Sequence, residues 1–306
     1  MMVSLGQIRS RLLTVTVVLG VIPAGVSIGQ VPSKGPTRDP SVEAPVLSGI
    51  TIDGDLNDWP AALPRYPINH LHVLPPYYGS NGLEGANLMT SPDLSAAFSV
   101  GYDPKENLVY LAVIVRDDMH VVGHDGFWDT DAVEVYVDGR HSEDSVPNYP
   151  GGKNPETADA SELPVFQYIG IPGEGRIYGV KKSSGRDRGP DNPILMFGDI
   201  KKTRTRMAFR RTRGLTVYEW AIEAFDHYPD TPTKLVPGGK LGFDVAVVDK
   251  DKPAVSAAAE TEPEDDRSAW VTWVPEYRGL KFFNAANLGE VVLGLPPAAG
   301  PPADKN

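Results

Sequence analysis

Short apolar stretches with a period of two residues dominate the middle of this chain. Leu241, Phe243, Val245 and Val247 alternate with other residues, so that every second side chain would lie on the same face of a strand. Gly, Pro, Asn or Asp bound each such run, and no long stripe with the 3.6-residue helical period is present. The pattern predicts an all-β fold, an antiparallel β-sandwich of the immunoglobulin-like or jelly-roll-like kind. Strands are expected at 95–102, 108–115, 133–137, 204–213, 217–224, 241–247 and 288–293.

The two ends of the chain differ in composition from its middle. Residues 1–29 combine a short basic start, an apolar run and small residues, which is typical of a secretory signal peptide. The apolar run is shorter than the ~20 residues that span a bilayer, so we expect no membrane span after its removal. Residues 30–46 and 295–306 are rich in proline and predict a linker and a disordered tail. One domain is therefore expected at 47–294, in a secreted or periplasmic protein, with long loops at 74–93, 139–163, 181–199 and 250–267.

Charge and cysteine content restrict the partners of such a domain. The chain has a net charge of −11, and loss of an arginine-bearing leader makes it more negative. An acidic surface repels phosphates, so nucleic acid is not expected as a partner, whereas calcium is attracted. There is no cysteine, which excludes disulfides, thiolate metal sites and covalently attached haem.

An acidic turn follows the first apolar segment of the expected domain. Asp53 and Asp55 flank a glycine, and Trp59 follows shortly after. Carboxylate oxygens are good calcium ligands, which makes both aspartates candidates for a metal site. The alternative is a tight Asp-Gly turn with the tryptophan packed beneath it.

A second acidic pair comes directly after the most apolar strand. Asp117 and Asp118 are adjacent, and neighbouring carboxylates repel each other unless a cation or hydrogen-bond donors lie close. Calcium is one interpretation and a solvated loop is the other. His120 and His124 follow. Without a clear third ligand they are better explained as loop histidines than as a transition-metal site.

An aromatic residue precedes one of the expected strands. Trp128 comes shortly before a strand whose valines alternate with Glu134 and Tyr136, so the last two share the face opposite the valines. A flat ring beside a carboxylate suits a sugar, whose C–H groups stack on the ring and whose hydroxyls donate to the carboxylate. The alternative is a buried tryptophan and a solvated glutamate. Farther on, Trp270 and Trp273 are three residues apart and should point to opposite faces of a strand.

Six segments, taken in order, resemble the family 9 carbohydrate-binding modules. They are IDGDLNDW, NLVYLAVIVRDD, WDTDAVEVYVDG, YEWAIEAF, LGFDVAVVDKD and NLGEVVL, and together they extend over 48–293. The resemblance implies an antiparallel β-sandwich with structural calcium. It also implies a non-catalytic module that binds sugars or polysaccharide ends and supports carbohydrate catabolism, often beside glycoside hydrolases.

The resemblance also assigns roles to individual residues. Trp128 and either Phe282 or Phe283 would enclose the sugar between their rings, and Glu134 would be the carboxylate on the strand. Gln167 falls near the position at which well-known members have an arginine. The chain therefore departs from the pattern twice, with phenylalanine in place of the second tryptophan and an uncharged amide in place of arginine.

Two other functions remain to be weighed. Relatives with this fold can hold a b-type haem between a methionine and a histidine or lysine, for which Met89, Met119, His70 and His72 are the candidates. Glycoside hydrolysis needs two carboxyl groups about 5–5.5 Å or about 6.5–9.5 Å apart across a cleft. Here the acidic residues lie mostly in turns and none forms a distinctive pair, so we expect binding rather than catalysis.

Overall fold

The computed structural model describes ten segments of one compact unit, residues 37–306. The remaining unit, residues 1–36, lies outside the described residues, and so do the expected signal peptide at 1–29 and the start of the expected linker. Within the described segments, no helix is long and apolar enough to cross a membrane. The segments are 39–74, 78–122, 129–142, 165–172, 176–182, 195–198, 203–228, 230–252, 267–275 and 285–296, of which 176–182 and 195–198 are described by their backbone alone.

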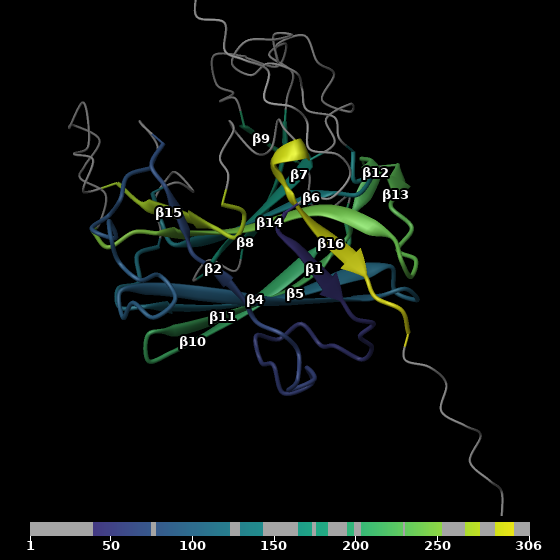
Figure 1. The fold of residues 1–306 in the computed structure, drawn as a ribbon, viewed down its shortest axis with the longest axis horizontal. Coiled ribbons are helices and arrows are strands. Elements are labelled where there is room, and N and C mark those ends of the chain that lie inside the picture. Colours follow the sequence, from purple (N-terminus) through teal and green to yellow (C-terminus); the bar gives the residue numbers. More distant parts are fainter. Residues whose placement is uncertain are drawn as a thin grey trace, which may run out of the picture. The chain divides into compact units, whose positions relative to one another are not determined.

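The larger of two β-sheets has nine strands, and Figure 1 labels most of them. The main order of its strands is β1-β16-β14-β6-β7-β8-β9. In addition, β15 pairs with β14, and β3 pairs with β15. The β1–β16 pair is parallel, and the other described pairs of this sheet are antiparallel. The strands are β1 (Ser41–Ala44), β3 (His70–His72), β6 (Ala132–Asp138), β7 (Val165–Ile171), β8 (Arg176–Lys182), β9 (Leu195–Gly198), β14 (Lys240–Asp249), β15 (Ala269–Thr272) and β16 (Gly289–Leu293).

The smaller sheet has five antiparallel strands in the order β10-β11-β5-β4-β2. A separate two-stranded hairpin, β12 with β13, and a 3-10 turn, η7, complete the described elements. The bounds are β2 (Tyr66–Ile68), β4 (Leu94–Asp103), β5 (Leu108–Asp117), β10 (Arg206–Thr212), β11 (Leu215–Ile222), β12 (Phe225–His227), β13 (Thr231–Pro232) and η7 (Ala285–Asn287).

Side chains from both sheets form the central core. Phe98 of β4 packs on Phe243 of β14 with ring centroids 6.3 Å apart, and edge-on against Trp273 at 5.2 Å. Val133 and Val135 of β6 enter the same cluster, as their alternation predicts. The two sheets therefore lie face to face, and the predicted β-sandwich is confirmed. Each of the seven strands expected from the sequence is present, with its ends shifted by at most a few residues.

The structure differs from the sequence-based prediction at the start of the domain. Residues 41–44, expected within the linker at 30–46, form β1 and pair with β16, so that Ser41 is opposite Glu290. Val42 and Ala44 are buried there. The proline-rich composition of this segment did not predict a strand. The strand is stabilised by a partner near the other end of the chain, which local sequence does not reveal. A second short strand, β9, occupies part of the long loop expected at 181–199.

The Asp-Gly turn at Gly54 lies against the smaller sheet. Glu219 of β11 accepts hydrogen bonds from the backbone N–H groups of Asp53 at 2.8 Å and Gly54 at 2.9 Å. Its other oxygen accepts one from the indole N–H of Trp59 at 2.8 Å. Trp59 is buried, so the interpretation of a tight turn over a packed tryptophan is confirmed.

Gly54 is required at this turn for two reasons. Its φ is +82°, and a Cβ there would lie 2.7 Å from the backbone carbon of Phe209. Gly54→Ala therefore combines left-handed strain with a backbone clash, and we expect it to lower the free energy of unfolding by about 2–4 kcal/mol in urea titrations. Gly238→Ala is the matched control, because Gly238 has a φ of +79° but nothing within 4 Å of its Cβ position. Equal losses in the two variants would contradict the argument from close approach.

Candidate functional site

Glu134 lies on β6, on the face that points away from the central core. Val133, Val135 and Val137 face the core between the sheets, and Tyr136 belongs to a second apolar cluster on the opposite face. The predicted alternation is therefore confirmed. Glu134 is not solvated, however, because only 1% of it is exposed. Both faces of this strand are covered.

Hydrogen-bond donors surround the Glu134 carboxylate. Oε1 accepts from the Tyr78 hydroxyl at 3.2 Å, and Oε2 accepts from the Tyr136 hydroxyl at 2.5 Å and the Trp270 indole at 3.0 Å. Burial raises the pKa of Glu134, and these hydrogen bonds act in the opposite direction because they stabilise the charged form. A buried carboxylate with this many donors is a fixed centre around which the neighbouring side chains are oriented.

Gln167 continues this polar network onto the next strand. It is directly opposite Tyr136 in the β6–β7 pair, and its Nε2 donates to the Tyr136 hydroxyl at 3.0 Å. Gln167 is buried, and its Oε1 has no hydrogen-bond partner among the described residues. A buried acceptor without a donor is rare in folded proteins, so this oxygen is left for a donor that the described residues do not supply.

Two aromatic rings cover the network from the side. Tyr78 and Trp270 are stacked, with centroids 5.5 Å apart and planes inclined by 13°. Trp270 belongs to the outer apolar cluster and Trp273 to the central core, which confirms that the two tryptophans point to opposite faces. The sequence-based prediction did not identify Tyr78 or Trp270 as donors to Glu134. The remaining predicted ring residues, Trp128, Phe282 and Phe283, lie outside the described residues.

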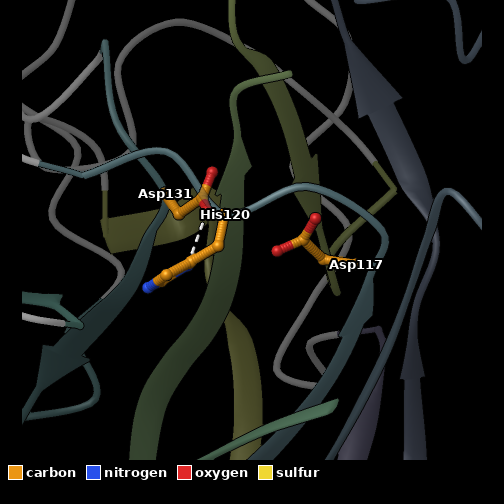
Figure 2. A group of neighbouring side chains, drawn as sticks. All are labelled: Asp117, His120 and Asp131. Atoms are coloured by element: carbon orange, nitrogen blue, oxygen red, sulfur yellow. Dashed lines mark hydrogen bonds and ion pairs between the residues drawn. The ribbon is translucent and has the colours of Figure 1, made fainter. Parts of the chain in front are cut away.

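A cluster of carboxylates forms a second candidate site near the ends of β5 and β14. Three groups of side chains, each with its ligand atoms within 4.8 Å of one another, share members. Figure 2 shows the first of them, Asp117, His120 and Asp131. The second contains Asp117, Asp249 and Asp251, and the third contains Asp93, Asp118 and Asp251.

Burial, and after it the proximity of these carboxylates to one another, raises their pKa values. Burial and the nearby Asp131 raise the pKa of Asp117 to about 6, although the Arg211 guanidinium opposes the shift. Burial and Asp93 raise the pKa of Asp251 to about 6 as well, and the pKa of Asp249 is well above its usual range, through burial and the charge of Asp251. Burial and the neighbouring carboxylates therefore both disfavour the charged form of these side chains.

Some oxygens of the cluster are already occupied. Asp131 accepts from the His120 ring and the Val121 backbone at one oxygen, and from the Lys250 backbone at the other. Arg211 donates to one oxygen of Asp117 at 2.9 Å. The second oxygen of Asp117 is buried and has no hydrogen-bond partner among the described residues, and the same holds for Oδ1 of Asp251. Orphaned carboxylate oxygens in an oxygen-rich cluster fit a hard cation such as calcium.

The four aspartates predicted as metal ligands are thus divided between two places. Asp117 and Asp118 belong to the cluster. Asp53 and Asp55 are not members of it and serve the Asp-Gly turn: Asp53 accepts from the Asp55 backbone at 2.8 Å, and Asp55 pairs with Arg210 at 2.5 Å. The sequence-based prediction missed the other cluster carboxylates, which only long-range folding brings together. They are Asp93, Asp131, Asp249 and Asp251.

Apart from His120, the described histidines and methionines considered for haem or transition metals are not members of the acidic cluster. Met89 and Met119 are 61% and 44% exposed. The Nε2 of His72 lies 2.9 Å from the Thr272 hydroxyl, and the His72 ring packs beside Trp270. His70 is on β3 with His72, and His124 lies outside the described residues. None of these observations favours a haem site.

Comparison with known proteins agrees with the resemblance found in the sequence. Residues 77–150 match the family model described as carbohydrate family 9 binding domain-like. No curated protein matches the chain in sequence.

Among solved structures, a family 9 carbohydrate-binding module from Caldicellulosiruptor kristjanssonii in complex with cellotriose is similar, with a TM-score of 0.53 and 15% identity over 85% of this chain and 98% of that chain. A structure of a family 9 module from the same organism in complex with glucose gives a TM-score of 0.52 and 15% identity, over 85% of this chain and 100% of the other. The resemblance to family 9 modules and the shared fold are thereby confirmed.

Proposed function

We propose that this chain is a non-catalytic module that recognises sugars or the ends of polysaccharide chains. The unpartnered Oε1 of Gln167, held beside the Glu134 network on the outer face of the larger sheet, supports this proposal most directly. The amide is held by the hydrogen bond that its Nε2 donates to Tyr136, so its buried Oε1 is prepared to accept a hydrogen bond from one sugar hydroxyl. The family match over 77–150 supports the same proposal.

Short chains of glucose are the first ligands to consider. The two similar structures contain cellotriose and glucose. Both oxygens of Glu134 already accept hydrogen bonds, so we assign Glu134 the role of orienting Tyr78 and Tyr136. Trp128 and either Phe282 or Phe283 provide the ring faces in this proposal, as the resemblance implies, and the neutral amide of Gln167 binds hydroxyls without selecting a charge.

Titration calorimetry with cellotriose and glucose tests the sugar site. We expect the wild-type protein to bind, Trp128→Ala to lose binding through the missing ring face, and Gln167→Leu to bind roughly 10-fold more weakly through one lost hydrogen bond, equivalent to about 1.4 kcal/mol. Lys105→Gln, at an exposed turn of the smaller sheet, is the control and should bind normally. Melting temperatures establish that each variant is folded. Absence of binding to these sugars and to a broad glycan panel would refute the proposal.

The acidic cluster is proposed as a structural calcium site. Asp117, Asp118, Asp249 and Asp251 supply its oxygen ligands, and the orphaned oxygens of Asp117 and Asp251 support this assignment. When bound, calcium would supply positive charge that offsets the repulsion between these carboxylates. No part in sugar chemistry is assigned to it.

Thermal unfolding with and without calcium tests this site. Calcium at a hundredfold excess over its Kd should add about 2.7 kcal/mol to the stability of the EDTA-treated protein. Asp251→Asn should abolish most of that gain because it removes one ligand charge. Asp55→Asn is the matched control, since Asp55 lies at the Asp-Gly turn, and it should retain the full gain. A calcium response that depends on Asp55 and not on Asp251 would place the ion elsewhere.

We also propose that the protein is secreted or periplasmic and acts beside glycoside hydrolases in carbohydrate catabolism. Its basic start, apolar run and small residues within 1–29 support export. Mass spectrometry of the mature protein should show an N-terminus directly after Gly29. A mature chain that retains Met1 in the membrane fraction would contradict removal of the leader.

A further inference from the structure

The outer face of the smaller sheet carries a row of side chains that crosses all five strands. Strand register places Arg210, Val217, Ile114, Ala97 and Pro67 side by side in that order. With neighbouring strands about 4.8 Å apart, the row is on the order of 19 Å long. A groove of about 760 Å³ lies over it, within the size range of ligand pockets.

Arginines border this groove although the chain as a whole is acidic. Arg65, Arg116 and Arg210 line it, in a chain whose net charge is −11. Arg210 pairs with Asp55, the one carboxylate among the described lining residues. Arg65 and Arg116 are exposed and form no ion pair with a described residue. The groove is therefore a locally positive region of an acidic chain. Its two free guanidinium groups present N–H donors in the planar fork that binds carboxylates.

The rest of the lining combines apolar side chains with hydroxyls. Ser95 and Thr212 contribute the hydroxyl groups, and the apolar residues are Leu56, Pro67, Met89, Ala96, Ala97, Ile114, Leu215 and Val217. None of the described lining residues is aromatic, so the groove lacks the ring platforms on which nucleic acid bases stack. The groove is also unfavourable for a lipid chain, because the apolar surface of the chain would desolvate the hydroxyls and the bordering arginines. A sugar ring that bears a carboxylate suits all of these side chains. Its C–H face can pack on the apolar residues, its carboxylate can pair with the arginines, and its hydroxyls can form hydrogen bonds with the hydroxyl side chains.

We propose that this groove binds an acidic oligosaccharide, with carboxylates of uronate units on Arg65 and Arg116 and sugar C–H faces on Ile114 and Ala97. The length of the row accommodates several sugar units. This site goes beyond the proposed sugar site, because it lies on the other sheet and shares no residue with the Glu134 network. One chain would then hold a neutral and an acidic part of a glycan at separate places.

Titration calorimetry with tetragalacturonate at neutral pH tests the groove, with calcium kept constant. The double variant Arg65→Gln with Arg116→Gln should bind at least 10-fold more weakly than wild type, and wild-type affinity should fall as salt increases. Lys105→Gln with Lys234→Gln removes the same charge at exposed positions outside the groove lining and should bind as wild type does. Trp128→Ala should retain tetragalacturonate binding, whatever its effect on cellotriose. All variants alter exposed or predicted ligand-facing residues, and circular dichroism checks that each is folded.

Several results would overturn the proposal. They are no binding of tetragalacturonate by wild type, equal weakening in the arginine and lysine variants, or loss of binding in Trp128→Ala alone. Arginine-dependent sedimentation with anionic lipid vesicles, without binding of tetragalacturonate, would identify a membrane surface as the occupant instead. Failure of the cellotriose titration would leave this test intact, because the two sites are read with different ligands and different variants.

Discussion

Burial of both faces of β6 is the constraint on which the rest of the structure depends. Every residue of the strand is buried. Its valines complete the core between the two sheets, while Glu134 and Tyr136 lie under a second apolar cluster on the outer face. Asp131, directly before the strand, reaches the acidic cluster. The core, the proposed sugar site and the proposed calcium site are therefore positioned by one seven-residue strand.

Buried carboxylates require compensation, and the chain achieves it in different ways. Glu219 receives two backbone N–H groups and an indole. Glu134 receives two phenol hydroxyls and an indole. Asp117 has an arginine at one oxygen and nothing described at the other. Since an uncompensated buried charge is costly, the first two carboxylates are complete without a ligand and the third is not.

The sequence pattern predicted those features that depend on neighbouring residues. Alternation was sufficient for β4, β6 and β14 and for the opposite orientations of Trp270 and Trp273, and a continuous apolar run was sufficient for β5. It could not predict β1, since that strand is stabilised by pairing with β16 at the far end of the chain. For the same reason, local pattern identified Asp117 and Asp118 but not Asp249 and Asp251. The donors Tyr78 and Trp270 were missed because the contact with Glu134 joins three separate segments.

The pairing of β1 with β16 has a consequence for how the domain is completed. β1 can take its place only after residues 289–293 are available, because its described partner is that last strand. β16 also covers part of one edge of β14, from Lys240 to Phe243. A nascent chain that ends before residue 289 thus has two unpaired strand edges, and such edges invite pairing with other chains. Folding of this domain is consequently a whole-chain event, and a C-terminal truncation is a hazard for aggregation as well as a loss of stability.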